Sequence, residues 1–182
     1  VRGGVAEGMS EFSRIVRLDS LGSGARAMSI AADEAERAAL ARRFALIAIE
    51  QLEADAEIVR EGDVVKAEGR LRAAVTQSCV ACAEPVPALI DEAFSLRFVP
   101  PENFEADADE IELSEADCDV IPYEDGAIDL GEAVAETMAL ALPPFPRSPD
   151  ADAILKAAGV LSEEDAGPFA ALKALRDKLS GS

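Results

Sequence analysis

Cys79 and Cys82 form a Cys-x-x-Cys pair, a spacing at which two thiols can share a metal ion or act as a redox dithiol. A structural zinc site needs four ligands, and the chain offers only Cys118 as a further cysteine and no histidine. A redox dithiol favours a helix N-terminus, where the thiolate is stabilised, whereas this pair follows a β-patterned segment and precedes Pro85. We therefore expect two half-buried structural thiols and no cofactor, with Cys79, Cys82 and Cys118 as the alternative metal ligands.

Other residue patterns that carry out catalysis are missing from the sequence. Without histidine, the usual arrangements of a nucleophile with its base cannot form. The glycine-rich motifs that bind phosphate groups are also missing. Carboxylate pairs are numerous, but a chain with 36 Asp and Glu residues contains them by chance. We expect no catalytic residue and a protein that is not an enzyme.

The formal net charge of −19 over 182 residues restricts the partners of the protein. Such a chain repels the phosphates of nucleic acids and the anionic surfaces of membranes. No apolar run approaches the ~18 residues that a membrane-spanning helix needs. We expect a cytoplasmic protein whose natural partners are basic proteins, with the alternative that the charge only maintains solubility.

The acidic residues concentrate between Arg97 and Arg147, an interval that contains no Lys or Arg. Its first part, residues 102–125, has little apolar content, which predicts a solvated loop. Asp107-x-Asp109 is similar to the start of a calcium loop, but the glycine and the distant glutamate of an EF-hand are missing. Binding of a basic partner is the functional alternative to a solvated loop.

The first half of the chain predicts a helix and a long β-hairpin after a short strand near residues 12–18. Asp33 is a suitable N-cap for a helix over residues 33–44. Apolar residues then alternate with charged ones over residues 45–77, and a Glu61-Gly62-Asp63 turn divides this stretch into two strands. A third strand over 88–99 completes an antiparallel meander.

The second half predicts two short strands around an Asp125-Gly126 turn and a helix over residues 130–142 that Asp129 caps and Pro143 ends. Residues 169–179 have the pattern of a short amphipathic helix that could bind its own core or a partner. The expected fold is α+β: an antiparallel sheet, open or closed like a barrel, packed by two or three helices. We expect residues 1–8 to be an expression remnant or an upstream extension, 9–146 to form the domain, and 147–182 to be a flexible tail.

Several motifs in order resemble the YceD family, also known as the DUF177 domain. They are the helix at 33–44, the Cys-x-x-Cys turn followed by Glu84-Pro85-Val86, the helix that closes in Leu140-Ala141-Leu142-Pro143, and Pro168 to Leu172. Each motif is weak alone, and their ordered combination is fairly specific. The resemblance covers about residues 9–179 and marks Cys79, Cys82, Glu84, Pro85, Val86, Leu140, Leu142 and Pro143 as family-signature residues.

This resemblance implies a bacterial cytoplasmic factor that supports accumulation of large-subunit (23S) ribosomal RNA and ribosome biogenesis. Members are often encoded beside a small basic protein of the large subunit, which makes a basic ribosomal or ribosome-assembly protein the expected partner. Some relatives carry a second cysteine cluster after the Leu-Ala-Leu-Pro helix, where this chain has residues 144–149 without cysteine. The competing hypothesis is a structural zinc-binding module that uses Cys79 and Cys82.

Overall fold

The computed structural model describes residues 10–22, 24–103 and 119–160. The chain divides into two compact units, one of residues 1–77 with 87–143 and the other of residues 78–86 with 144–182. The first unit contains most of the regular structure, and the second contains the cysteine turn. The predicted helix at 169–179 and most of the predicted acidic loop lie outside the described residues.

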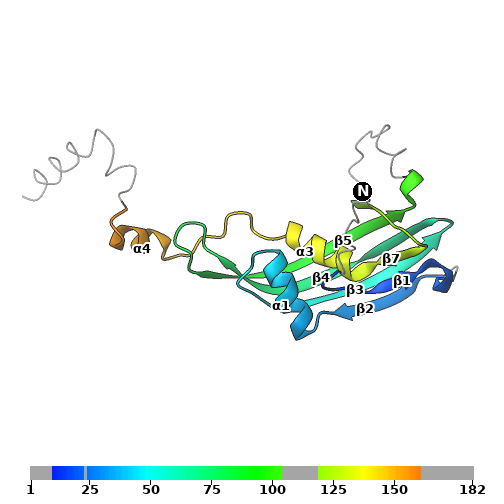
Figure 1. Ribbon diagram of the computed structural model, residues 1–182, viewed down its shortest axis with the longest axis horizontal. Coiled ribbons are helices and arrows are strands. Elements are labelled where there is room, and N and C mark those ends of the chain that lie inside the picture. Colours follow the sequence, from blue (N-terminus) through cyan, green and yellow to red (C-terminus); the bar gives the residue numbers. More distant parts are fainter. Residues whose placement is uncertain (1–9, 23, 104–118, 161–182) are drawn as a thin grey trace, which may run out of the picture. The chain divides into compact units, whose positions relative to one another are not determined.

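A five-stranded sheet in the order β2-β3-β4-β5-β6 forms the framework of the fold (Figure 1). Its strands are β2 (Arg26–Ala31), β3 (Ala48–Glu61), β4 (Val64–Ser78), β5 (Pro85–Val99) and β6 (Asp119–Pro122). A separate pair consists of β1 (Ile15–Arg17) and β7 (Ala127–Asp129), which run antiparallel. The helices are α1 (Glu34–Arg43), α3 (Leu130–Leu140) and α4 (Ala151–Ala157), and a 3-10 turn covers Leu18–Ser20.

The long hairpin of β3 and β4 confirms the alternating pattern of the sequence. Between Leu52 and Ile58 of β3 the even-numbered residues are buried, and the residues between them point to the other face. The two strands meet at the predicted turn, where Gly62 has a φ of 67°, a conformation that glycine adopts without strain. A single register shift between Ile49 and Gln51 interrupts the pairing.

Helices α1 and α3 begin where their capping residues predict. The Asp33 carboxylate accepts a hydrogen bond from the Glu36 N–H, and the Glu36 carboxylate accepts one from the Asp33 N–H, which completes a capping box. The Asp129 carboxylate accepts from the N–H groups of Gly131 and Glu132. Each cap satisfies donors that a helix leaves unpaired at its first turn.

One hydrophobic core joins the two helices to the sheet. Leu40 of α1, Val134 and Met138 of α3, and Leu71 and Phe98 of the sheet are buried within it. Burial of a side chain the size of Leu or Phe contributes about 1.5–3 kcal/mol. The core therefore fixes α3, together with the strand β7 that leads into it, against β5.

Four details of the sequence prediction are wrong. The sheet is open, so the barrel-like alternative is excluded. The strand β2 was not predicted, and β6 pairs with β5 in a parallel arrangement, so the sheet is mixed. β5 begins at Pro85, earlier than expected. The two short strands predicted around the Asp125-Gly126 turn are, by contrast, confirmed as β6 and β7, and a Glu124–Ala127 bridge closes the turn.

Candidate functional site: a cysteine turn and an acidic groove

The Cys-x-x-Cys pair lies in a tight turn that belongs to the second unit. The Cys79 N–H donates to the Glu84 carbonyl over 2.8 Å, and the Ala83 N–H donates to the Cys79 carbonyl over 3.0 Å. Ala83 has a φ of 61°, in the left-handed region that a non-glycine residue seldom adopts. These contacts bring the chain back on itself between the two cysteines and the start of β5.

Backbone N–H groups surround the sulfur of Cys79. The N–H of Ser148 lies 3.3 Å from the Cys79 Sγ, and that of Ala81 lies 3.4 Å from it. The Ser148 N–H is the main cause that lowers the pKa of Cys79, to about 7. The pKa of Cys82 is raised, because loss of solvent and the neighbouring Cys79 outweigh the opposing N–H of Glu84. Cys79 is therefore the first of the two thiols to ionise.

The turn also contacts the segment that follows the Leu140–Pro143 motif. The Val80 N–H donates to the carbonyl of Pro146 over 2.9 Å, and Pro146 is buried. Both cysteines are free thiols, with Cys79 buried and Cys82 half-buried. Within the described ranges, no three Cys, Asp or Glu side chains are placed to share a metal ion, and Cys118 lies outside those ranges. For the zinc alternative, the described residues therefore provide two of the four ligands, Cys79 and Cys82.

Within the first unit, a residue near the end of β4 contacts the Leu-Ala-Leu-Pro motif. Gln77, which precedes the cysteine turn, is buried, and its Nε2 donates to the Pro143 carbonyl over 3.1 Å. Leu142 packs against the core, whereas Leu140 is exposed. The Leu-Ala-Leu-Pro motif therefore anchors the end of α3 to the end of β4.

The other signature residues shape the hairpin beside the turn. Glu84 contributes its carbonyl to the turn, Pro85 is the first residue of β5, and Val86 is half-buried. In these contacts the motif acts through its backbone. The contact that Glu84 makes is through its backbone carbonyl, so it gives the Glu84 carboxylate no chemical role.

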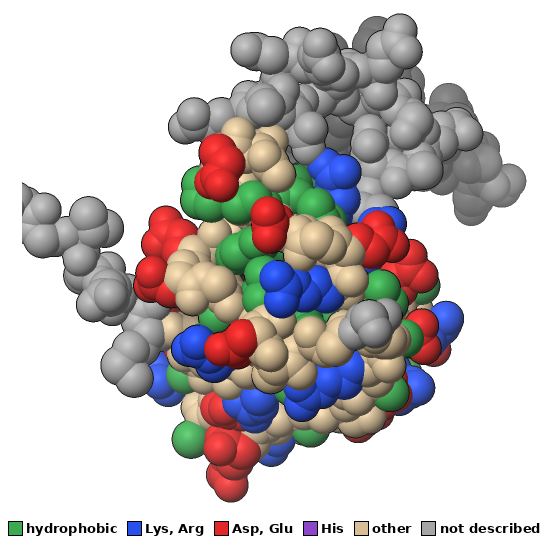
Figure 2. Space-filling model, turned by 90° about the vertical axis from the view of Figure 1, so that its right-hand side faces the viewer, with side chains coloured by type: hydrophobic (Ala, Val, Ile, Leu, Met, Phe, Trp, Pro, Cys, Tyr) green, Lys and Arg blue, Asp and Glu red, His purple; other side chains and the backbone are tan. Residues whose placement is uncertain are grey.

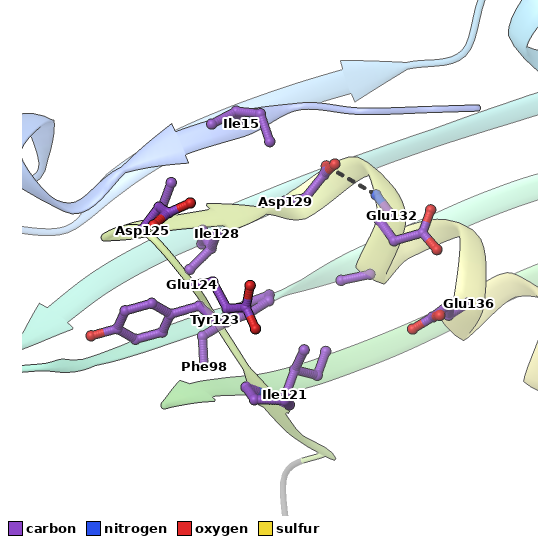
Figure 3. A pocket seen from close by; sticks show the side chains of 13 residues that line it. Ile15, Phe98, Ile121, Tyr123, Glu124, Asp125, Ile128, Asp129, Glu132 and Glu136 are labelled. Carbon is purple, nitrogen blue, oxygen red and sulfur yellow. Dashed lines mark hydrogen bonds between the residues drawn. The ribbon is translucent and has the colours of Figure 1, made fainter. Parts of the chain in front are cut away.

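A groove of ≈ 380 Å³ lies in the first unit, between β6, β7 and the first turns of α3 (Figure 3). Phe98 and Ile128 form its buried floor, Ile121 lines it from β6, and Ile15 of β1 borders it with 59% of its surface exposed. Five carboxylates also line it: Glu124, Asp125, Asp129, Glu132 and Glu136. The groove thus combines an apolar floor with an acidic rim.

Three of these carboxylates have partners that hold the fold together. Asp129 caps α3 and also accepts from the Ser13 hydroxyl. Glu132 lies 2.6 Å from Arg43 and accepts from the Ser10 hydroxyl, and Glu136 lies 3.6 Å from Arg43. The hydrogen bond from Arg43 is the main cause that lowers the pKa of Glu132.

The remaining two carboxylates, Glu124 and Asp125, have no hydrogen bond or ion pair to any residue that the structure describes. They lie on the turn between β6 and β7, where Asp125 and Gly126 have φ values of 52° and 63°. Two successive left-handed residues define the tight hairpin turn for which Asp-Gly is a preferred pair. The turn therefore presents two uncompensated negative charges at the rim of the groove.

The acidic excess is local. Figure 2 shows one end of the molecule, where Lys and Arg side chains are interspersed with Asp and Glu. On the sheet, Arg72 lies 3.2 Å from Glu53 of the adjacent strand, and Arg70 pairs with Asp91 of the strand on its other side. The segment from Asp119 to Pro143, by contrast, carries six carboxylates and no Lys or Arg.

The fold is an α+β domain with an open mixed sheet, in which the signature motifs support the ends of β4 and α3. A family model described as large ribosomal RNA subunit accumulation protein YceD matches residues 67–176, which extend from β4 past α4. The chain belongs to the YceD family. No curated protein and no solved structure matches it.

Sequence reasoning missed the residues that connect distant segments. Gln77 contacts Pro143, 66 residues away, and Ser148 contacts Cys79, 69 residues away. Arg43 contacts Glu132, 89 residues away. The available signal for Gln77 was its position: it is a polar residue where the alternation of β4 places a buried side chain. Nothing in the local sequence indicates the role of Ser148, because only its backbone N–H takes part.

Proposed function

We propose that this protein is a non-enzymatic, cytoplasmic factor that supports the accumulation of large-subunit ribosomal RNA and ribosome biogenesis. It acts by contact with a basic ribosomal or ribosome-assembly protein. The family name supports the role in large-subunit RNA accumulation. The observation that carries the proposed mode of action is the acidic groove, where Glu124 and Asp125 have no partner among the described residues.

The charge of the groove favours a protein partner over an RNA partner. Direct RNA binding depends on Lys and Arg that neutralise phosphates, and the rim of this groove consists of carboxylates. Ribosomal proteins are rich in Lys and Arg, so their approach is accelerated by the net charge of −19. The protein therefore acts on ribosomal RNA through a protein.

A binding role also agrees with the ionisation of the groove. A general acid needs a carboxyl group whose pKa is raised toward neutrality. In Glu132 the shift is downward, because Arg43 stabilises the charged form. Glu132 therefore lacks the raised pKa that a general acid needs.

Deletion of the gene and complementation test this function. We expect deletion to lower the ratio of mature large-subunit to small-subunit ribosomal RNA, and the wild-type gene to restore it. Affinity capture of the full chain at low salt should recover basic large-subunit or assembly proteins. An unchanged RNA ratio together with capture of no such protein would contradict the proposal.

A zinc-binding structural module is the second candidate function. The N–H groups of Ala81 and Ser148 around the Cys79 sulfur, which lower its pKa to about 7, favour the thiolate that a metal ligand must provide. Metal analysis of protein purified without chelator tests it, with a Cys79→Ser/Cys82→Ser variant as the control. A metal-free wild-type protein that unfolds cooperatively excludes a structural ion.

A further inference from the structure

We propose that the groove between β6, β7 and α3 binds a cationic amphipathic segment of the partner protein. An apolar side chain of that segment packs against the exposed Ile15 and the half-buried Ile121, while its flanking Lys or Arg side chains pair with Glu124 and Asp125. This inference rests on the proposed function and identifies the surface and the chemistry of its partner.

The floor of the groove provides an apolar surface that is fixed in place. Phe98 is 2% exposed and Ile128 is 1% exposed, so both belong to the core and support the groove from beneath. Tyr123 lines the groove, and its hydroxyl donates to the Asp63 carbonyl over 2.8 Å, which fixes the ring. Ile15 extends the apolar surface with a side chain that is 59% exposed. A floor that is already ordered loses little entropy on binding.

The rim provides charge on two sides of this floor. Glu124 and Asp125 project from the β6–β7 turn, and Glu136 lies on α3 (Figure 3). Arg43 already neutralises part of the α3 side through Glu132 and Glu136. The carboxylates without a cationic partner among the described residues are therefore those of the turn, Glu124 and Asp125.

The size of the groove fits side chains of a chain segment. A volume of ≈ 380 Å³ is at the lower end of the range of ligand pockets. A plain polyamine would satisfy the carboxylates but leave the apolar side chain of Ile15 in water. A segment with alternating cationic and apolar side chains satisfies both, so the observations favour it.

A peptide titration monitored by amide NMR of the full chain tests the inference. The probe is a short peptide of alternating Lys and Leu, and the comparison probes are a Lys-Ser peptide of equal charge and spermidine. We expect the Lys-Leu peptide to shift amides between Ile121 and Asp129 and to bind more tightly than either comparison probe. The double variant Glu124→Lys/Asp125→Asn should weaken its binding by at least about tenfold.

The variants are chosen so that the fold is kept and the charge change is matched. Asparagine tolerates the left-handed conformation of position 125, where lysine would be strained. The control Glu57→Lys/Glu68→Gln changes the net charge equally at exposed positions on β3 and β4. We expect this control to retain most of the affinity, and thermal unfolding should confirm that both variants are folded.

The inference would be overturned by perturbed amides outside the groove or by equal weakening in the control variant. Equal affinity for spermidine would also overturn it. In those cases the proposed function survives if the wild-type chain still captures basic large-subunit proteins. If the peptide maps to the groove but no such protein is captured, the groove assignment stands and the proposed function fails.

Discussion

The outer face of the sheet and the groove beside α3 are both charged, but they use their charge differently. On the sheet, Arg72 lies between Glu53 and Asp55, and Asp55 also accepts from the Ser29 hydroxyl of β2. Across the groove rim, Glu124 and Asp125 have no cation within the part of the chain that the structure describes. Paired charges between strands stabilise the sheet. The carboxylates of Glu124 and Asp125 have no such stabilising partner among the described residues, which is why we assign them to binding.

Among the variants that test this comparison, a substitution within the sheet is expected to change the free energy of unfolding most. A Cβ at Gly69 would lie 2.1 Å from the Asp55 carbonyl and 2.8 Å from the Phe94 ring. Because a backbone carbonyl cannot move aside, we expect Gly69→Ala to destabilise the protein by roughly 2–4 kcal/mol. Chemical denaturation measures this loss, and Gly22→Ala is the control, since nothing lies within 4 Å of its Cβ. Equal stability of the two variants would contradict the described packing.

The next effect concerns Arg43, which connects the groove to the fold. Its guanidinium pairs with Glu132 over 2.6 Å and with Glu11 over 3.1 Å. We expect Arg43→Ala to lower the free energy of unfolding by roughly 1–2 kcal/mol, because it leaves the partly buried Glu132 without its cation. The same variant should bind the Lys-Leu peptide more tightly, since two more carboxylates become free.

Arg42→Ala is the matched control for that variant. Arg42 is the preceding residue of α1 and is exposed. It should change stability by less than about 0.5 kcal/mol and should not alter peptide affinity beyond the effect of net charge. If the two arginine variants behave alike, the bridging role of Arg43 is wrong.

A smaller effect is expected from the sheet charges. Arg72→Ala removes exposed ion pairs to Glu53 and Asp55. Exposed pairs of this kind contribute roughly 0–1 kcal/mol, so we expect a loss of about 0.5 kcal/mol in denaturation. Peptide affinity of the groove should be unchanged. A strong rise in affinity would show that the sheet face, where Glu53 and Asp55 lose their cation, binds the peptide instead of the groove.

The smallest effect is the dependence of stability on pH. The pKa of Glu132 is lowered in the folded protein, mainly by Arg43, below its ordinary value of 4.5. Its contribution to stability is therefore complete above pH 4.5 and is lost as the pH falls through the lowered value. Urea unfolding in this acid range should show the difference between wild type and Arg43→Ala shrinking as the pH falls. A difference that is constant over the range contradicts the pairing.

The sequence predicted those elements whose signals are local. The β3–β4 hairpin followed from alternation and a glycine turn, and α1 and α3 followed from Asp33 and Asp129 as caps. Strand β2 escaped prediction because this edge strand buries a single residue, Ile30, and so shows no alternation. The parallel pairing of β6 with β5 depends on tertiary packing and has no sequence signal nearby.

The candidate site divides in the same way. The absence of Lys and Arg around Glu124 and Asp125 was visible in the sequence, as was their turn. That Phe98 and Ile15 would border these carboxylates was not, because they come from β5 and β1, distant along the chain. The cysteine pair was visible as well, but the N–H of Ser148 that lowers the pKa of Cys79 was not.

Site-specific photo-crosslinking in growing cells tests the central claim most directly. A photoreactive amino acid at Glu124, with the same residue at the exposed position Glu57 of β3 as the control, reports what lies against each surface. We predict that position 124 forms adducts with basic proteins of the large ribosomal subunit or its assembly, and that position 57 does not. Adducts of position 124 with RNA alone, or the same proteins at both positions, would contradict the account.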